Sequence, residues 1–92
     1  MKSRKIQVVN PSGLHLRPAG LLCQTSMKFK SKISILFQDN EINAKSVLNV
    51  MASGIKCGSE IEVQCTGDDE EEALEAVCNL ISTGLKEEEG MN

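Results

Sequence analysis

Aromatic side chains are almost absent from this chain, which has two Phe and neither Trp nor Tyr among its 92 residues. The hydrophobic core must therefore be built from aliphatic side chains. No apolar run approaches the roughly 20 residues that span a membrane. No signal-type apolar run follows the basic residues at 1–5 either. We therefore expect no membrane insertion and retention in the cytoplasm.

An excess of basic residues is also lacking, since the net charge is −3. A chain of this charge, without basic runs interleaved with aromatics, is not expected to have nucleic acid as its main partner. The length and the ordinary share of hydrophobic residues fit one small domain. Because no repeat or linker interrupts the sequence, we predict a single domain over 1–92.

The four cysteines, at positions 23, 57, 65 and 78, form no C-x-x-C pair. Their spacing fits no common zinc template, so we expect no metal site. An even number would permit disulfides in a secreted protein. The apolar surroundings of Cys23, Cys65 and Cys78 favour buried reduced thiols instead. Cys57 lies in a predicted loop and is expected to be the most exposed.

The most informative stretch of the sequence is 10–19, which contains the only histidine. The turn-forming residues at 10–13 come first, and apolar residues spaced three and four apart follow from Ala19. His15 is therefore predicted at the junction of a loop and a helix, near the N-cap. Pro18 supports this placement, because proline is tolerated in the first turn of a helix.

A histidine at this junction has specific chemical possibilities. The first turn of a helix carries unpaired N–H groups and partial positive charge, which stabilise an anion such as phosphate. The same field disfavours a protonated imidazole, and a neutral imidazole can act as a nucleophile. Arg17 adds a forked cation that can bind two phosphate oxygens. The pattern predicts a phosphoryl acceptor, although a lone exposed histidine beside a solvated arginine is the ordinary alternative.

Two segments of the chain resemble the same family. The segment Gly13-Leu14-His15-Leu16-Arg17-Pro18-Ala19 resembles the active-site motif of HPr, the histidine-containing phosphocarrier of the bacterial phosphoenolpyruvate-dependent sugar phosphotransferase system. The segment Asn43-Ala44-Lys45-Ser46-Val47-Leu48-Asn49-Val50-Met51 resembles the regulatory serine segment of that family. The two blocks lie at the spacing typical of the family, and the resemblance covers nearly the whole chain.

Hydrophobic periodicity predicts the order β-α-β-β-α-β-α. Apolar faces on the strands and helices favour an α+β fold of two layers. The resemblance implies an open-faced sandwich, a four-stranded antiparallel sheet with three helices on one face. Strands are predicted over 5–9, 31–38, 41–44 and 60–65, with a turn at Asp39-Asn40. Helices are predicted from His15 to about 29, from Ser46 to about 53, and from about Asp69 with a buried stripe ending at Leu85; 87–92 is a polar tail.

The resemblance implies a phosphoryl relay without a cofactor. Enzyme I would transfer its phosphoryl group to Nδ1 of His15, and His15 would pass it to the IIA component of a sugar permease. Arg17 would neutralise the charge of the group, and the backbone N–H groups of Leu16 and Arg17 would cradle it. Such a carrier is part of a phosphotransferase relay but is not itself an enzyme.

Ser46 has a structural and a regulatory interpretation. It suits the N-cap of the short helix that follows. A phosphate on Ser46 would also lie close to the first N–H groups of that helix. The resemblance implies phosphorylation by an ATP-dependent HPr kinase/phosphorylase. The alternative function is a regulatory binding module that acts through phospho-Ser46 on a transcription factor, and a generic interaction domain is a third hypothesis.

Partner docking is predicted for an apolar patch around His15, although core packing is the alternative for Leu48 and Met51. Relatives often carry basic residues at the positions of Gln24, Met27 and Asn49, which are uncharged here. Steering of an acidic partner should therefore be weaker, or displaced toward Lys28, Lys45 and Lys56. This could indicate a specialised pathway, such as a nitrogen-regulatory one. The expected state is a monomer, and the predicted patch comprises Leu14, Leu16, Gly20, Leu21, Leu48 and Met51.

Overall fold

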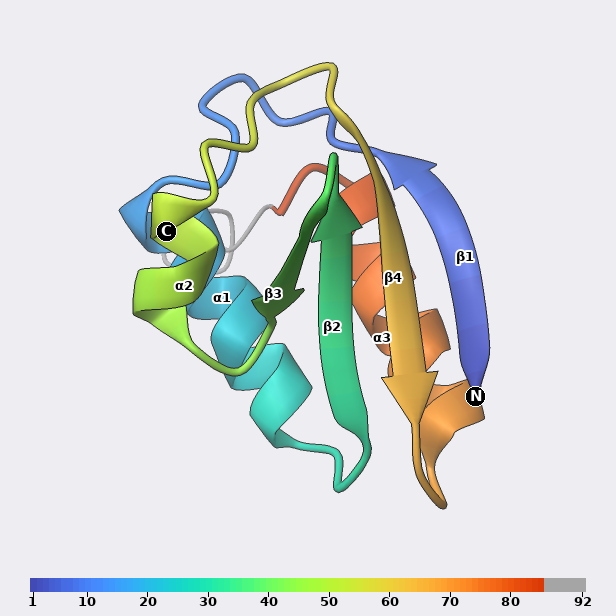
Figure 1. The fold of residues 1–92 in the computed structure, drawn as a ribbon. Coiled ribbons are helices and arrows are strands. Elements are labelled where there is room, and N and C mark those ends of the chain that lie inside the picture. The colour runs from blue at the N-terminus through green and yellow to red at the C-terminus, as the bar shows by residue number, and fades with distance from the viewer. Residues whose placement is uncertain (86–92) are drawn as a thin grey trace.

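The computed structural model describes residues 1–85 as a four-stranded antiparallel sheet and three helices (Figure 1). The sheet order is β1-β4-β2-β3. The strands are β1 (Lys2–Gln7), β2 (Lys32–Phe37), β3 (Asn40–Asn43) and β4 (Glu60–Thr66). The helices are α1 (Leu16–Met27), α2 (Val47–Ala52) and α3 (Glu70–Ser82).

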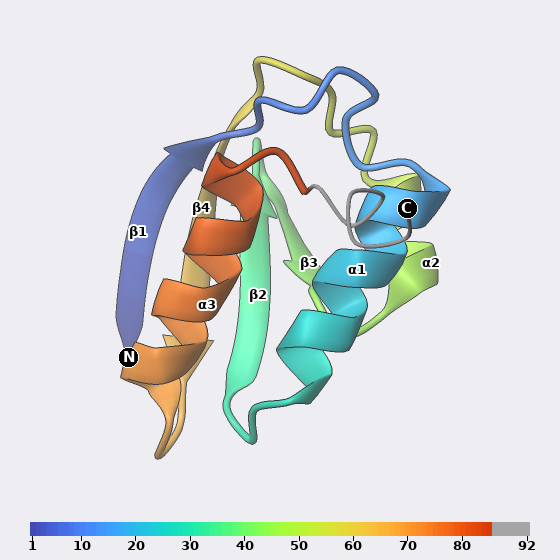
Figure 2. The same ribbon diagram turned by 180° about the vertical axis from the view of Figure 1, so that it is seen from behind.

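The elements form two layers. Helices α1 and α3 cover one face of the sheet, and the short helix α2 packs beside α1 (Figure 2). The opposite face of the sheet is left open (Figure 1). This arrangement confirms the predicted fold class and the predicted order of elements.

The core between the layers is aliphatic, as the scarcity of aromatics predicts. Alternate residues of the strands point toward the helices, which is the period-2 pattern of a half-buried sheet. Both phenylalanines only flank this core, because Phe29 and Phe37 are partly buried. The largest fully buried side chains are Leu22, Ile33, Ile35, Ile61, Ile81 and Leu85.

The first strand begins and ends earlier than predicted. Ion pairs explain the early start, because Lys2 lies 3.7 Å from Glu71 and Arg4 lies 3.1 Å from Glu75, both on α3. An edge strand can present cations toward the helix layer when their long side chains reach such partners. Beyond the strand, Val8 remains fully buried and exchanges backbone hydrogen bonds with the 58–59 segment.

Two other boundaries also differ from the prediction. The turn between β2 and β3 consists of Gln38 and Asp39, not Asp39 and Asn40, because Asn40 already pairs with Phe37. Gln38 takes the positive φ of 56° that this tight turn requires. Helix α3 ends at Ser82, and Leu85 is buried beyond it in a left-handed conformation. The predicted tail at 87–92 lies outside the described residues.

The cysteines are free thiols in this structure. Cys65 and Cys78 are buried, and burial raises the pKa of the Cys65 thiol to about 11. Cys57 is exposed, as predicted, whereas Cys23 is half-buried and donates a hydrogen bond to the Lys45 carbonyl at 3.0 Å. No helix within residues 1–85 is long and apolar enough to cross a membrane.

Candidate functional site

His15 is the N-cap residue of α1, which confirms its predicted place at the junction of loop and helix. Its backbone is extended (φ −82°, ψ −166°), and its carbonyl accepts the helical bond from Ala19 at 2.8 Å. The side chain is exposed and makes no capping hydrogen bond. The imidazole therefore faces solvent at the positive end of the helix.

The first turn of α1 leaves donors without acceptors. Within residues 1–85, the N–H groups of Leu16 and Arg17 have no hydrogen-bond acceptor, and the third position is the buried Pro18, which has no N–H. This turn contains no acidic residue. Two free backbone donors thus follow the solvent-facing His15 directly, at a helix start that is accessible to an anion.

The loop before His15 is anchored to the segment that precedes β4. Gly13 adopts φ +68°, and a Cβ at this position would lie 2.7 Å from the Ile55 carbonyl oxygen and 2.8 Å from the Lys56 Cα. The next residue, Leu14, donates its N–H to the same Ile55 carbonyl at 3.1 Å. Only glycine fits this close approach of two backbones. The loop is therefore fixed just before the histidine.

Arg17 lies on the same turn as His15 and lines a shallow pocket. Its side chain is exposed and forms no ion pair within the described part of the chain. The pocket has a volume of about 230 Å³. It is lined by Asn10, Pro11, Ser12, Arg17, Pro18, Gly84 and Leu85. The loop before α1 and the chain beyond α3 thus meet beside the guanidinium.

Ser46 is the N-cap of α2, and its hydroxyl oxygen accepts the Asn49 N–H at 3.2 Å. The structural interpretation of Ser46 is thereby confirmed. The side chain is half-buried, on the helix that packs against α1.

Only some residues of the predicted docking patch are exposed. Leu16 is 64% exposed, Leu48 78% and Met51 39%, so core packing does not account for these three side chains. Gly20 and Leu21 are half-buried. Leu14 was wrongly included, because it is 3% exposed and belongs to the core. Leu14 is held between the anchored Gly13 and the N-cap His15, and its side chain packs into the core beneath the loop.

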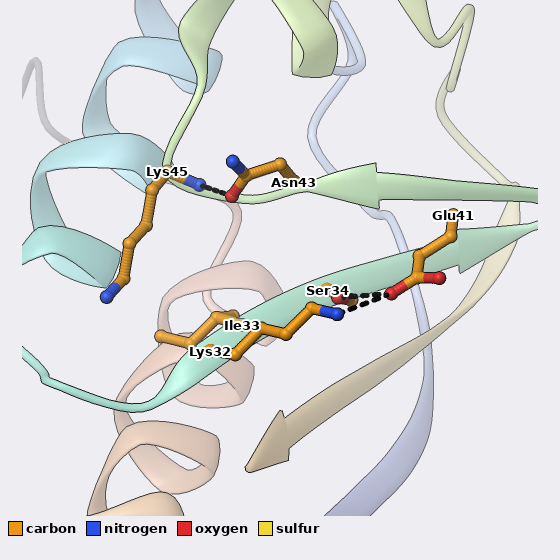
Figure 3. A pocket seen from close by; sticks show the side chains of 6 residues that line it. All are labelled: Lys32, Ile33, Ser34, Glu41, Asn43 and Lys45. Atoms are coloured by element: carbon orange, nitrogen blue, oxygen red, sulfur yellow. Dashed lines mark hydrogen bonds and ion pairs between the residues drawn. The ribbon is translucent and has the colours of Figure 1, made fainter. Parts of the chain in front are cut away.

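Lys45 is half-buried, and its ammonium donates to the Phe29 carbonyl at 2.8 Å, which fixes the position of its charge without neutralising it. It borders a polar pocket of about 400 Å³ on β2 and β3 (Figure 3). There the Glu41 carboxylate accepts from the Ser34 hydroxyl at 2.9 Å and lies 3.6 Å from the Lys32 ammonium. The polar side chains that line this pocket therefore contact one another across β2 and β3.

The sequence predicts Asn10 only as a turn residue, whereas the structure shows that it is buried in the loop before His15. An Asn three residues before a glycine is a weak signal, because such pairs occur in many turns. Within residues 1–85, no group of three or more His, Cys, Asp or Glu is placed to hold a metal ion.

Comparison with known proteins gives one consistent result. Residues 2–83 match the family model described as the PTS HPr component phosphorylation site. The phosphocarrier protein HPr of Treponema pallidum (strain Nichols) is 40% identical over 88 residues, which cover 96% of this chain and 100% of that protein. The crystal structure of HPr-C-His from Thermoanaerobacter tengcongensis superposes with a TM-score of 0.90 at 40% identity, covering 95% of this chain and 98% of that one.

A further structural relative is described as a dimer. The Bacillus subtilis catabolite repression containing protein Crh, described as a dimer with a swapped domain, matches with a TM-score of 0.74 at 31% identity. The match covers 90% of this chain and 95% of that chain.

Proposed function

This chain belongs to the HPr family of phosphocarrier proteins, and on that premise we propose that His15 accepts a phosphoryl group from enzyme I and passes it to the IIA component of a sugar permease. The observation that carries this proposal is the exposed imidazole at the N-cap of α1, beside two backbone donors and Arg17. No other histidine in the chain competes for the role.

The transfer step needs no residue beyond those at this site. The lone pair of Nδ1 attacks phosphorus, a new N–P bond forms, and the bond to the donor breaks with its electron pair left on the donor. The other ring nitrogen keeps its hydrogen, so a neutral imidazole gains the group without losing a proton. The N–H groups of Leu16 and Arg17 and the Arg17 guanidinium compensate the charge of the incoming oxygens.

An exposed site suits a carrier rather than an enzyme. A carrier must release its group about as readily as it accepts it, so strong stabilisation of the phosphorylated state would trap it. One helix end and one guanidinium stabilise a phosphate by about 0.3–3 kcal/mol each, which is modest. Exposure also lets two different partners reach the same ring in turn.

The surface around His15 supports docking of those partners. Leu16 and Leu48 are exposed large apolar side chains on α1 and α2, which pack side by side (Figures 1 and 2). Gly20, Leu21 and Met51 extend this surface. A cytoplasmic location is part of the same proposal, because the relay's enzyme I would have to meet the protein there. A monomer is the simplest state for this function, whereas Crh shows that a relative can form a dimer.

Labelling with phosphoenolpyruvate and enzyme I tests the proposal. The wild-type chain should gain an acid-labile phosphate, and His15→Ala should gain none. Asn79→Ala, an exposed substitution on α3 outside the predicted docking patch, serves as the control and should be labelled like the wild type. Equal labelling of the wild type and His15→Ala would show that His15 is not the acceptor.

Regulation through Ser46 is a second proposal, favoured by one observation. The half-buried hydroxyl lies at the start of the helix that carries the exposed Leu48 and Met51. A phosphate there would alter the surface that partners of His15 also use, either by repelling them or by attracting a transcription factor. Incubation with ATP and an HPr kinase/phosphorylase should add acid-stable phosphate to the wild type. The phosphate should be absent from Ser46→Ala.

A further inference from the structure

We infer that Asn10 is a positioning residue for His15, acting through the carbonyl group of Gly13. The inference rests on the proposed carrier function and extends it to a side chain that does not touch the phosphoryl group. Asn10 is 5% exposed, which is unusual for an asparagine in a surface loop. A buried amide in this place requires an explanation from its contacts.

The contacts of Asn10 all close the loop that carries the histidine. Its Nδ2 donates to the Gly13 carbonyl at 2.7 Å and to the Ser12 hydroxyl at 3.3 Å. Its own backbone carbonyl accepts the Gly13 N–H at 3.1 Å. Asn10 therefore holds Gly13 from both sides of that residue, through the N–H and through the carbonyl.

The orientation of the amide is determined by these bonds. If the amide were reversed, Oδ1 would face the Gly13 carbonyl oxygen, and two acceptors would meet at hydrogen-bond distance. In the orientation observed, Oδ1 is buried and has no hydrogen-bond partner among the described residues. An unpaired buried acceptor is unfavourable. The donor contact to Gly13 is therefore retained despite a cost to stability.

Control of the Gly13 carbonyl is also control of the peptide that leads to His15. The plane of a peptide group is rigid, so the direction of this carbonyl fixes the direction of the Leu14 N–H. That N–H donates to Ile55, and the Leu14 side chain is buried. The imidazole itself makes no hydrogen bond within residues 1–85. Its place beside the first turn of α1 therefore depends on the backbone before it.

Asn10 also borders the pocket that Arg17 lines. Asn10 thus lies near Arg17 as well as on the loop that leads to His15. A small change in the loop would alter the distance between imidazole and guanidinium, and misplacement of reacting groups by about 1 Å lowers rates strongly. The structure assigns to Asn10 the maintenance of this relation, not a contact with phosphate.

Kinetics with the carrier as substrate of enzyme I test this role. In Asn10→Ala, kcat should fall about tenfold while KM stays near the wild-type value, because the docking surface is unchanged. The loss of two hydrogen bonds is partly offset by removal of the unpaired Oδ1, so the variant should remain folded. Asn43→Ala is the control, because the Asn43 side chain accepts the Lys45 N–H at 2.9 Å at the end of β3, away from the His15 loop. Its kcat should match the wild type.

A measurement on the wild type makes the test independent of the variant. The side-chain NH₂ protons of Asn10 should exchange with solvent more slowly than those of the exposed Asn43, and the imidazole resonances of His15 should shift in Asn10→Ala but not in Asn43→Ala. Fast exchange at Asn10, or equal kcat in the two variants, overturns the inference. If the wild type itself accepts no phosphate, the carrier proposal fails, and the exchange and imidazole data still decide the role of Asn10.

Discussion

Helices α1 and α3 begin with opposite side-chain chemistry, although the physics of their first turns is the same. Both present unpaired N–H groups and a partial positive charge. The first turn of α3 contains Glu70, Glu71 and Glu72, whereas the first turn of α1 contains no acidic residue. The start of α3 therefore carries carboxylates of the chain itself, and the start of α1 carries none.

The acids at the start of α3 are structural. The Asp69 carboxylate accepts from the N–H groups of Lys30 and Ser31, each at 2.9 Å, and from the Ser31 hydroxyl. The Glu70 carboxylate accepts the Gly67 N–H at 3.0 Å and lies 3.2 Å from the N-terminal ammonium. The Ser31 hydroxyl holds the pKa of Asp69 below its usual value, and the Gly67 N–H does the same for Glu70.

The comparison shows how one fold element serves two purposes. The Asp69 carboxylate joins the start of α3 to the turn after α1 through hydrogen bonds to Lys30 and Ser31. In the proposed relay, a phosphoryl group at α1 must arrive and leave, and the absence of an acid in that first turn leaves room for it. The side chains placed at a helix start, not the helix dipole, distinguish a structural end from an exchangeable site.

The largest effect is expected when a carboxylate is placed at the start of α1, which makes the two helix starts alike. In Leu16→Glu the new side chain would compete with phosphate for the first-turn donors and for Arg17. We expect the rate of phosphoryl transfer from enzyme I to fall about 100-fold, similar to the loss of a catalytic anion-binding donor. Stability should rise by about 0.5 kcal/mol, since an acid in the first turn complements the dipole. Stopped-flow transfer assays and urea unfolding measure the two effects.

The matched variant Leu16→Gln separates charge from docking. Both substitutions remove the same exposed apolar side chain, but glutamine adds no charge. If docking alone explains the loss, the two variants will have equal rates, and the comparison between the helix starts will not hold. We expect Leu16→Gln to raise KM and to change kcat little.

A second, smaller effect concerns the backbone that delivers the chain to α1. In Gly13→Ala the methyl group meets the Ile55 carbonyl and Lys56 Cα at a left-handed backbone conformation. We expect a loss of about 2 kcal/mol in the free energy of unfolding. In Gly54→Ala the backbone has a similar φ of +75°, but nothing lies within 4 Å of the new Cβ. That control should lose only about 1 kcal/mol, measured by urea unfolding. Equal losses would show that the close approach at Gly13 is unimportant.

The fold and the position of His15 could be predicted because their signals are local. Alternating and helical apolar patterns define the order of elements, and turn residues followed by Pro18 place His15 at a helix start. Boundaries were less accurate where a distant element decides them. The early start of β1 depends on Glu71 and Glu75, which lie about 70 positions away in sequence.

The remaining errors at the site also come from long-range contacts. Leu14 has the same apolar character as Leu16, but its side chain is 3% exposed and belongs to the core. Lys45 is predicted as a steering cation from its charge alone, and only the structure shows that its ammonium is held by the Phe29 carbonyl. Asn10 is one of several turn residues by sequence, and its burial appears only in three dimensions. Side-chain type predicts what a residue can do, but not what it contacts.

The smallest effect is a difference in acid sensitivity between the two helix starts. A carboxyl group whose pKa is lowered by folding adds stability above its unfolded pKa of about 4 and loses it as pH falls through the lower folded value. Asp69 and Glu70 at α3 fit this description, whereas α1 has no acid in its first turn. Asp69→Asn should therefore be less stable than the wild type at pH 7. The gap should narrow as pH falls below about 4.

Leu16→Gln provides the matched control at the other helix start, because it removes no carboxylate. Its unfolding free energy should follow the wild-type pH profile in parallel between about pH 5 and 2, as measured by urea unfolding at each pH. The prediction is wrong if the difference in unfolding free energy between the wild type and Leu16→Gln narrows as pH falls. It is also wrong if the difference between the wild type and Asp69→Asn stays constant. The Glu41 carboxyl, whose pKa the Ser34 hydroxyl lowers, contributes equally to all three proteins and cancels in the differences. The pH dependence that remains in the difference for Asp69→Asn then comes from Asp69. The absence of pH dependence in the difference for Leu16→Gln reflects a first turn of α1 that contains no acid.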